Sequence, residues 1–525
     1  MKIILLFSLV LFIIIMGNSA VAQTLKKKPN VLFIIVDQLR YDALSIGGNT
    51  IIKTPNIDRI GRQGVYFKNN YTPMAVCAPA RASIFTGRTV EHTGMLNNEL
   101  AYHPQPGVMP QQTYDELLTT AGYVAEYYGK YHSTPDHTAV YQNPEKLTSK
   151  GMPIIGAGME QHFKDYLKKH VPEQPAKSGD YLDAFSGRYY TPNPLDKHFN
   201  ETPSTSKIYT QPDYHGRLNI PAEYTLTAMQ AKETIEALER LKDKAFSLTC
   251  SFHFPHAPML PAGKYYQMYE PKNMPVPVSI KDDMKNSPYK NANARLNNME
   301  YADTAKIKYM ISDYYGLVKE VDDWVGKILD KLDELKITNN TIIIFTADHG
   351  EMLGSHGLRE KNVFYEESAH VPLMISYPKV IKPNTVVDHY TSNIDLFATI
   401  FDYTGQGTPP SDGQSLRDLI EKKPSPRPNY VVTEWDFRGD VEPNYMIIKD
   451  GWKMFIPETA TSPVMNALYN LKDDPFEMNN LLGNNPNQAK YAGKVNELKG
   501  NLLEWLSKNA SKHINGVKDR MIVKN

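Results

Sequence analysis

Two segments of the sequence place metal-binding side chains directly after a short apolar run. The runs cover residues 31–36 and 342–345, and the polar residues that follow them are Asp37, Gln38, Asp348 and His349. Two carboxylates, an amide oxygen and an imidazole could together hold one divalent cation. The oxygen atoms favour Ca²⁺ or Mg²⁺, and the imidazole leaves room for Mn²⁺. Either pair alone is a weak signal, because Asp is common in turns.

A third segment carries a cysteine in a setting that could make it reactive. Residues 77–88 read C-A-P-A-R-A-S-I-F-T-G-R. Pro79 suits the first turn of a helix, so Cys77 is expected just before a helix N-terminus, where the helix dipole favours anionic groups. Two other interpretations are an unreactive thiol in a turn and the nucleophile of a cysteine hydrolase. For the second, a His is available but no local motif supports it.

Strands and helices must bring these segments together. Four apolar runs predict strands, at residues 31–36, 246–252, 342–345 and 372–376. Helical patterns lie between them, at residues 56–63, 114–121, 222–241 and 304–335. This alternation predicts an α/β fold with a large, mostly parallel central sheet flanked by helices. Sites in such sheets form at the carboxyl ends of the strands, which is where the metal-binding residues lie.

The chain is expected to contain a leader and two domains. Residues 1–22 have a basic start, a short apolar core and an A-V-A cleavage site, the pattern of a secretory signal peptide. The apolar run is too short to span a bilayer comfortably. We therefore expect an exported protein, periplasmic or secreted, without a membrane span after cleavage. Residues 23–410 would form the catalytic domain, with insertions at about 134–221 and 271–298.

Residues 411–525 predict a smaller C-terminal α+β domain built on a short antiparallel sheet. The strand patterns lie at 430–434, 445–448 and 452–456, and a closing helix is expected at 497–509. Trp435, Arg438 and Tyr445 are candidate substrate contacts, because aromatic residues and Arg are enriched at recognition sites.

Composition excludes one class of partner and bears on the cysteines. The 58 Lys and Arg residues equal the 58 Asp and Glu residues, so no net charge would attract nucleic acid. The two cysteines are Cys77 and Cys250. Export permits a disulfide, but Cys250 lies in an apolar run, where a free Cys behaves as a small hydrophobe. We expect both cysteines to be unpaired.

The Cys77 segment resembles the signature of the type I formylglycine sulfatases, in the alkaline phosphatase superfamily. The signature is C-x-P-x-R followed by T-G, and Ala80 stands where the family most often has Ser. Other segments resemble family motifs in the same order: Asp37-Gln38-x-Arg40, Gly129-Lys130-Tyr131-His132, Pro255-His256-Ala257-Pro258, Asp348-His349-Gly350, Lys361 with Tyr365-Glu366, and Leu468 to Pro475. His370 is a departure, because relatives often have Arg there.

The resemblance implies a role for each residue. A maturation enzyme would oxidise Cys77 to formylglycine, whose hydrate attacks sulfur through one hydroxyl. Arg81 and Lys130 would hold this nucleophile, and His256 and Lys361 would protonate the leaving oxygen and clamp the sulfate. His132 would remove the proton of the second hydroxyl, which expels sulfate and restores the aldehyde. Asp37, Gln38, Asp348, His349 and residue 77 would bind the cation, for which Ca²⁺ is expected before Mg²⁺ or Mn²⁺.

The favoured substrate is a sulfate ester on a carbohydrate, for example an algal or host polysaccharide fragment. The alternative within the superfamily is a phosphonate monoester hydrolase or phosphodiesterase, where the same modification and a similar metal set occur. A non-catalytic glycan-binding protein on this scaffold would have lost part of the site, and here the nucleophile, metal residues and lysines are all present.

Overall fold

The computed structural model describes residues 28–144, 147–148, 161–171, 190–192, 216–218, 220–257, 259–289, 304–436, 443–459, 462 and 464–523. The signal peptide predicted at residues 1–22 lies outside this set. So do most of the insertion predicted at 134–221 and the last part of the one predicted at 271–298. Within the described residues, no helix has the length and apolar character needed to cross a membrane.

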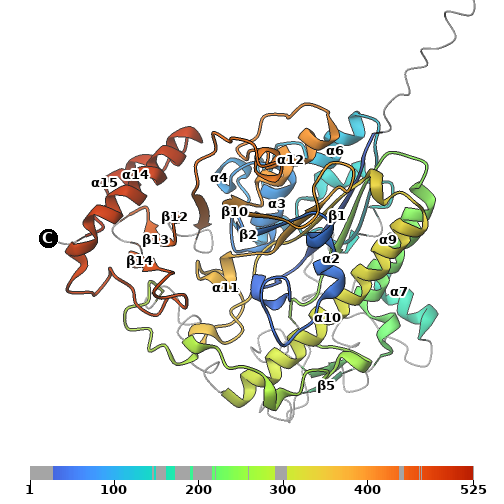
Figure 1. The fold of residues 1–525 in the computed structure, drawn as a ribbon, viewed down its shortest axis with the longest axis horizontal. Helices are drawn as coiled ribbons and strands as arrows, with labels where there is room; N and C mark the ends of the chain where they lie inside the picture. Colours follow the sequence, from blue (N-terminus) through green and yellow to red (C-terminus); the bar gives the residue numbers. More distant parts are fainter. Residues whose placement is uncertain are drawn as a thin grey trace, which may run out of the picture.

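A large central sheet organises the molecule (Figure 1), which confirms the predicted fold class. Its eight strands run in the order β10-β2-β9-β8-β1-β7-β3-β4. The strands are β1 (Asn30–Val36), β2 (Val65–Tyr71), β3 (Val124–Lys130), β4 (Leu147–Thr148), β7 (Phe246–Phe252), β8 (Thr341–Ala347), β9 (Leu373–Ser376) and β10 (Thr385–Ser392). Of these, β9 is antiparallel to both neighbours and every other pairing is parallel.

Helices cover both faces of this sheet. One face packs against α2 (Pro55–Gln63), α9 (Leu226–Leu241) and α10 (Thr304–Glu334). The other packs against α3 (Cys77–Thr86), α6 (Tyr114–Thr120) and α12 (Asp395–Thr404). Alternate residues of β1 enter the two cores, Leu32 and Ile34 on one side and Phe33 and Ile35 on the other. The continuous apolar run is explained by burial of this strand on both faces.

The chain beyond residue 430 builds a second sheet, as predicted. Its antiparallel strands are β11 (Val431–Asp436), β12 (Pro443–Lys449), β13 (Trp452–Pro457) and β14 (Ala467–Asn470). One face packs on α14 (Ala492–Lys508), and the other packs against Tyr71, Phe364 and Tyr365 of the large domain. The boundary expected near residue 410 stays a prediction.

Shorter elements complete the described fold. They are α4 (Val90–Thr93), α5 (Glu99–Tyr102), α7 (Gln161–His170), α11 (Glu366–Ala369), α13 (Arg417–Ile420), α15 (Ile514–Asp519), β5 (Tyr190–Pro192) and β6 (Gly216–Leu218). The helix expected at 222–241 begins at Leu226, because the Thr225 side chain accepts a hydrogen bond from the Ala228 amide at 3.1 Å and caps it there.

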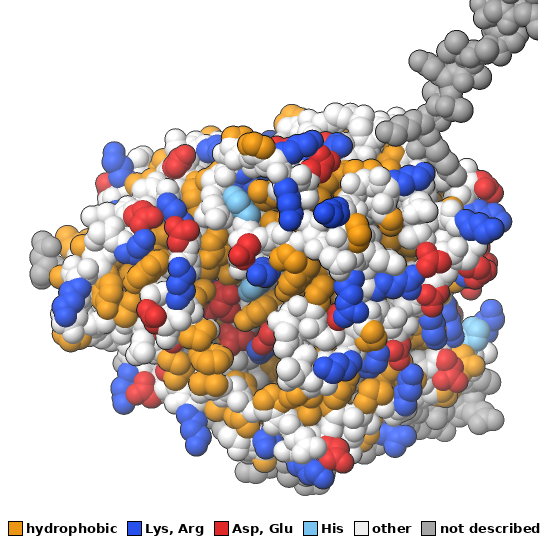
Figure 2. Space-filling view, viewed as in Figure 1, with side chains coloured by type: hydrophobic (Ala, Val, Ile, Leu, Met, Phe, Trp, Pro, Cys, Tyr) orange, Lys and Arg blue, Asp and Glu red, His pale blue; other side chains and the backbone are white. Residues whose placement is uncertain are grey.

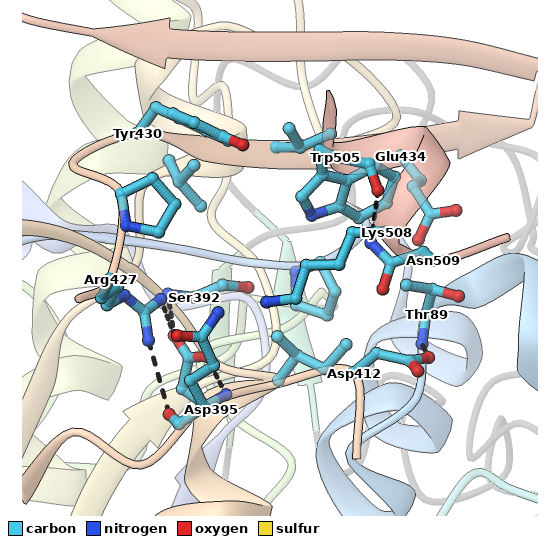
Figure 3. A pocket seen from close by; sticks show the side chains of 16 residues that line it. Thr89, Ser392, Asp395, Asp412, Arg427, Tyr430, Glu434, Trp505, Lys508 and Asn509 are labelled. Carbon is cyan, nitrogen blue, oxygen red and sulfur yellow. Dashed lines mark hydrogen bonds and ion pairs between the residues drawn. The ribbon is translucent and has the colours of Figure 1, made fainter. Parts of the chain in front are cut away.

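The junction of the two domains holds a buried carboxylic acid (Figure 3). Glu434 of β11 is 7% exposed, and its Oε2 accepts a hydrogen bond from the Val90 amide at 2.8 Å. An Arg427–Asp395 ion pair and Trp505 of α14 line the same small cavity. Burial raises the pKa of Glu434 to about 8, and the backbone donors at Val90 and Glu91 offset only part of this.

This junction should make the protein less stable as pH rises. Folded Glu434 keeps its proton to about pH 8, whereas the unfolded side chain loses it near the ordinary glutamate pKa of 4.5. The unfolded state therefore binds fewer protons in that window, and the free energy of unfolding falls with rising pH by up to about 5 kcal/mol. Melting temperatures measured across the window should show Glu434→Gln flattening the decline. Glu504→Gln, on the exposed surface of α14, is the control and should leave the decline of the melting temperature with pH unchanged. If both variants show the same decline, the pH dependence does not come from Glu434.

Candidate active site

The predicted site residues meet at the carboxyl edge of the large sheet. Asp37 follows β1 and Asp348 follows β8, and the register places Val36 beside Ala347. Lys130 is the last residue of β3, and α3 begins at Cys77. The parallel register therefore places side chains that are distant in the sequence at one edge.

Four of these residues form a buried cluster suited to a cation. Asp37, Cys77, Asp348 and His349 each offer a ligand atom, and these atoms all lie within 4.8 Å of one another. Nδ1 of His349 donates to the Gly350 carbonyl at 2.9 Å, so Nε2 is left as the acceptor. That Nε2 lies 3.0 Å from Cys77 Sγ and 3.6 Å from Asp37 Oδ1. A carbonyl that fixes the tautomer is the usual arrangement for a metal-binding imidazole, so these residues fit a divalent cation.

Two cations hold the carboxylates of this four-residue cluster. Arg81 is fully buried and donates from Nε to Asp348 Oδ2 at 2.8 Å. The Lys130 ammonium pairs with Asp37. Burial alone would raise the pKa of Asp37, but the positive charges nearby, above all Lys130, outweigh burial and hold the pKa well below its usual value. The buried charges are thus paired, as such charges must be.

Arg81 also fixes the positions of the surrounding strands. Its Nη1 donates to the Lys130 carbonyl at 2.6 Å and to Ser251 Oγ at 2.9 Å. One side chain of α3 thereby contacts the ends of β3 and β7 and the residue after β8.

Cys77 is the first residue of α3 and is 1% exposed. Burial and the charge of Asp37 raise the pKa of its thiol, whereas Lys130, Lys361 and His349 lower it. The cations prevail, so the pKa lies below the ordinary value. Ala80, the departure from the family signature, is fully buried inside the same helix.

Lys361 and His256 form a hydrogen-bonded pair beside the cluster. Lys361 Nζ donates to His256 Nε2 at 2.9 Å, and His256 Nδ1 donates to the Ala257 carbonyl at 2.7 Å. Burial, with Lys361 next, lowers the pKa of His256 well below its usual value. Burial also lowers the pKa of Lys361, but the negative groups Cys77, Glu360 and Asp37 raise it overall. The pair therefore consists of a neutral imidazole and a charged ammonium.

Gln38 reaches the same pair. Its side-chain oxygen accepts a hydrogen bond from Lys361 Nζ at 2.6 Å, and its amide nitrogen donates to Glu351. The backbone has a φ of 62°, a strained conformation that is found at functional sites. Its role as a metal ligand stays a prediction.

His132 lies nearby on the loop after β3. Its Nε2 shares a hydrogen bond with the Tyr102 hydroxyl. Burial, followed by the positive charges of Lys130 and Arg81, lowers the pKa of His132 well below its usual value. A neutral imidazole can accept a proton, as the predicted role requires. Tyr102 was not predicted from the sequence.

His253 is a second residue that the sequence analysis missed. It directly follows β7, is 1% exposed, and its ring centre lies 5.1 Å from that of His256. Neither ring nitrogen has a hydrogen-bond partner within the described part of the chain. Burial, with Lys130 next, lowers its pKa to about 3. The strand-end rule that identified Asp37 would also have identified His253.

The structure also bears on other residues that the sequence singled out. Tyr445 is wrong as a substrate contact, because it is 1% exposed and packs in the core between the small sheet and α14. Arg438 lies outside the described residues. His370, where relatives often have Arg, shares a hydrogen bond with Glu366 at 2.9 Å, and its ring stacks on Tyr41 at 3.9 Å. Both cysteines are free and buried.

Comparisons with known proteins agree with this geometry. The family model described as Sulfatase matches residues 29–406, and that described as N-sulphoglucosamine sulphohydrolase, C-terminal, matches residues 354–508. The chain is 29% identical over 486 residues to an arylsulfatase of Clostridium perfringens, covering 91% of this chain and 94% of the relative. It is 29% identical over 515 residues to an N-acetylglucosamine-6-O-sulfatase of Bacteroides thetaiotaomicron, covering 90% and 85%.

The fold is similar to that of a solved phosphonate monoester hydrolase from Silicibacter pomeroyi. The TM-score is 0.75 at 23% identity, covering 93% of this chain and 97% of that one. The Sulfatase model spans far more than half of the chain, and the curated relatives are matched over nearly their whole length. The chain therefore belongs to the sulfatase family, the sulfuric ester hydrolases of the alkaline phosphatase superfamily.

Proposed function

We propose that this protein is an exported sulfatase that hydrolyses a sulfate ester on a carbohydrate. The observation that carries the proposal is the buried four-residue cluster, with Arg81, Lys130 and Lys361 around it. Three cations close to one small site suit a substrate group with a delocalised negative charge. The relative named N-acetylglucosamine-6-O-sulfatase supports a sulfated sugar as the substrate class.

The nucleophile would come from residue 77. A formylglycine there would supply a hydrated aldehyde, and a divalent cation held by Asp37, Gln38, Asp348 and His349 would supply Lewis acidity. We expect Ca²⁺, with Mg²⁺ or Mn²⁺ as alternatives. Arg81 and Lys130 neutralise the carboxylates, so that the site does not repel an anionic ester.

The Lys361–His256 pair would handle the leaving oxygen. Lys361 Nζ already donates to His256 Nε2, so a proton at this position is shared between the two groups. The ammonium can hold the sulfate and deliver the proton that the departing sugar oxygen needs. His132, neutral and buried, would accept a proton when sulfate is released.

Export and maturation follow from the same proposal. The leader at residues 1–22 would direct the chain to the periplasm or outside the cell. A formylglycine-generating enzyme would act on the Cys77 segment as a partner.

An assay that compares sulfate esters with phosphonate monoesters and phosphodiesters tests this function. Sulfated mono- and oligosaccharides should be hydrolysed with a kcat/KM at least about tenfold above that for matched phosphonate monoesters and phosphodiesters. The phosphonate monoester hydrolase is the second candidate, favoured by the shared fold. Turnover that is dominated by phosphonates or diesters would overturn the sulfatase proposal.

His253 is expected to contact the substrate. His253→Phe keeps an aromatic ring but removes both nitrogens, so kcat/KM for a sulfated sugar should fall about 10- to 100-fold, mainly through KM. The melting temperature should not fall, because the lost nitrogens have no hydrogen-bond partner among the described residues. A lower melting temperature with unchanged kinetics would show that His253 is only structural. His137→Phe is the matched control, because His137 bonds Glu116 and Met109 and should lose stability instead.

A further inference from the structure

A second cavity opens beside α11, and its lining includes none of the four cluster residues. It has a volume of about 300 Å³, within the size range of small-molecule sites. Figure 2 shows acidic side chains in a hollow near the middle of this face, in the region of α11, with hydrophobic side chains around it. The lining of this α11 cavity shares no residue with the catalytic residues described above. Arg40 lies between the two, because its Nη1 donates to the carbonyl of Glu351, whose side chain bonds Gln38.

Most charges at the α11 cavity are already paired. Arg40 donates twice to Asp42, with both distances 2.7 Å. Glu366 accepts from Lys453 Nζ at 2.8 Å and from the Tyr71 hydroxyl at 3.0 Å. These groups therefore leave little net charge for a ligand to neutralise.

Glu367 is different. It lines the cavity, is 8% exposed, and its carboxylate makes no hydrogen bond or ion pair with any described residue. A buried carboxylate without a partner is costly, so such groups normally pair with a cation. The cavity lining thus carries one carboxylate without a hydrogen-bonded or ion-paired partner among the described residues. The nearby Arg40, which feels the charge of Glu367, is already paired with Asp42.

The walls of the α11 cavity are aromatic and apolar. Tyr41 and Tyr315 line it, and the rim includes Phe476 and Val278, which are 44% and 63% exposed. Aromatic faces attract organic cations once these leave water. A metal ion would instead need several oxygen ligands, and the oxygens of Asp42 and Glu366 are already engaged.

We propose that the α11 cavity binds a small organic ammonium, held by the Glu367 carboxylate and the tyrosine walls. The ligand would be a compact, partly apolar molecule that carries one positive charge. Either a quaternary ammonium such as choline or the protonated amine of an unacetylated hexosamine provides it. The site goes beyond the proposed function and stands whether or not the four-residue cluster hydrolyses sulfate esters.

Calorimetric titration of the full-length protein tests the proposal with four probes. Choline and glucosamine are the two cations, 3,3-dimethylbutanol and N-acetylglucosamine are their uncharged counterparts, and none of them carries sulfate. At least one cation should bind saturably and at least about tenfold more tightly than its counterpart, because charge-assisted bonds are the stronger ones. The cation that binds shows whether the natural ligand is a quaternary ammonium or a protonated sugar amine. Binding of both would mean that the site recognises only the positive charge.

Variants place the binding in the cavity. Glu367→Gln keeps the shape but removes the charge, so the affinity for the cation should fall at least about tenfold. Phe476→Leu, on the exposed rim, should weaken choline by a few-fold through loss of the aromatic face. Glu504→Gln removes one acidic charge from exposed α14 surface and should leave binding unchanged.

Three outcomes would overturn the proposal. The first is that neither cation binds saturably. The second is that Glu367→Gln and Glu504→Gln bind the cation equally well, which would place binding elsewhere or assign it to general charge. The third is that CaCl₂ alone binds in a Glu367-dependent way while both organic cations fail, which would make this a metal site. Melting curves of each variant, recorded without ligand, separate a loss of binding from a loss of folding.

Discussion

Cys77→Ala is expected to abolish sulfate ester hydrolysis, with kcat lowered at least about 10⁴-fold, since loss of a covalent nucleophile has effects of that size. The Cys77 sulfur lies within 4.8 Å of the ligand-type atoms of Asp37, Asp348 and His349, so no other residue can take its place without moving the cluster. The melting temperature should change little, because alanine fits inside α3 and buries no new polar group. Initial rates with a sulfated sugar, measured beside melting curves, check both expectations.

The second cysteine supplies the matched control. Cys250 is equally buried but lies inside β7, and its thiol pKa is raised to about 12, mainly by burial. Cys250→Ser should therefore keep wild-type kcat while it loses some stability. Mass spectrometry of the Cys77 peptide from active protein should show an aldehyde. Full activity with an unmodified thiol would rule out the formylglycine mechanism and leave the cysteine-hydrolase interpretation.

Asp348→Asn is expected to lower both activity and stability. The carboxylate of Asp348 belongs to the four-residue cluster and is the partner of fully buried Arg81 at 2.8 Å. Removing one partner of a buried ion pair costs about 3–5 kcal/mol, because the other charge is left without compensation. Loss of a metal ligand should lower kcat at least about 10³-fold. Chemical denaturation and initial rates measure the two effects.

Chelation separates these two effects. Removing divalent cations from the wild-type protein should suppress activity to a similar extent, and Ca²⁺ should restore it and raise the melting temperature. Asp388→Asn, on the exposed part of β10, is the control for loss of one acidic side chain and should respond as wild type does. Full activity in the presence of a strong chelator would contradict the proposed metal requirement.

The fold was predictable where burial leaves a clear pattern. Strands β1, β7 and β8 lie at the centre of the sheet and are apolar throughout, so their sequences reveal them. Strands β2 and β10 were missed because VYFKNNY and TVVDHYTS carry polar residues. They pair with each other at one edge of the sheet, where residues such as Lys68 and Asp388 remain exposed.

The sequence predicted which residues form the site, but not most of the contacts between them. Spacing and family resemblance placed Asp37, Cys77 and Asp348 together, and the register of β1 and β8 explains why. The Lys361–His256 hydrogen bond joins residues 105 positions apart through a loop whose path no local pattern specifies. His253 was missed although it directly follows β7, because a lone histidine at a strand end forms no pair of metal-binding side chains like that of Asp37 and Gln38. Its lack of a partner is visible only in three dimensions.

The burial of Cys77 also bears on whether its proposed maturation can come before or after folding. A thiol that is 1% exposed in the first turn of a packed helix is beyond the reach of another enzyme's active site. The proposed oxidation of Cys77 would therefore have to precede folding, and the two processes would compete for each newly made chain. A chain that folds first keeps its thiol for as long as it stays folded. Under the proposed mechanism, shortage of the maturation enzyme should produce stable, inactive molecules rather than misfolded ones.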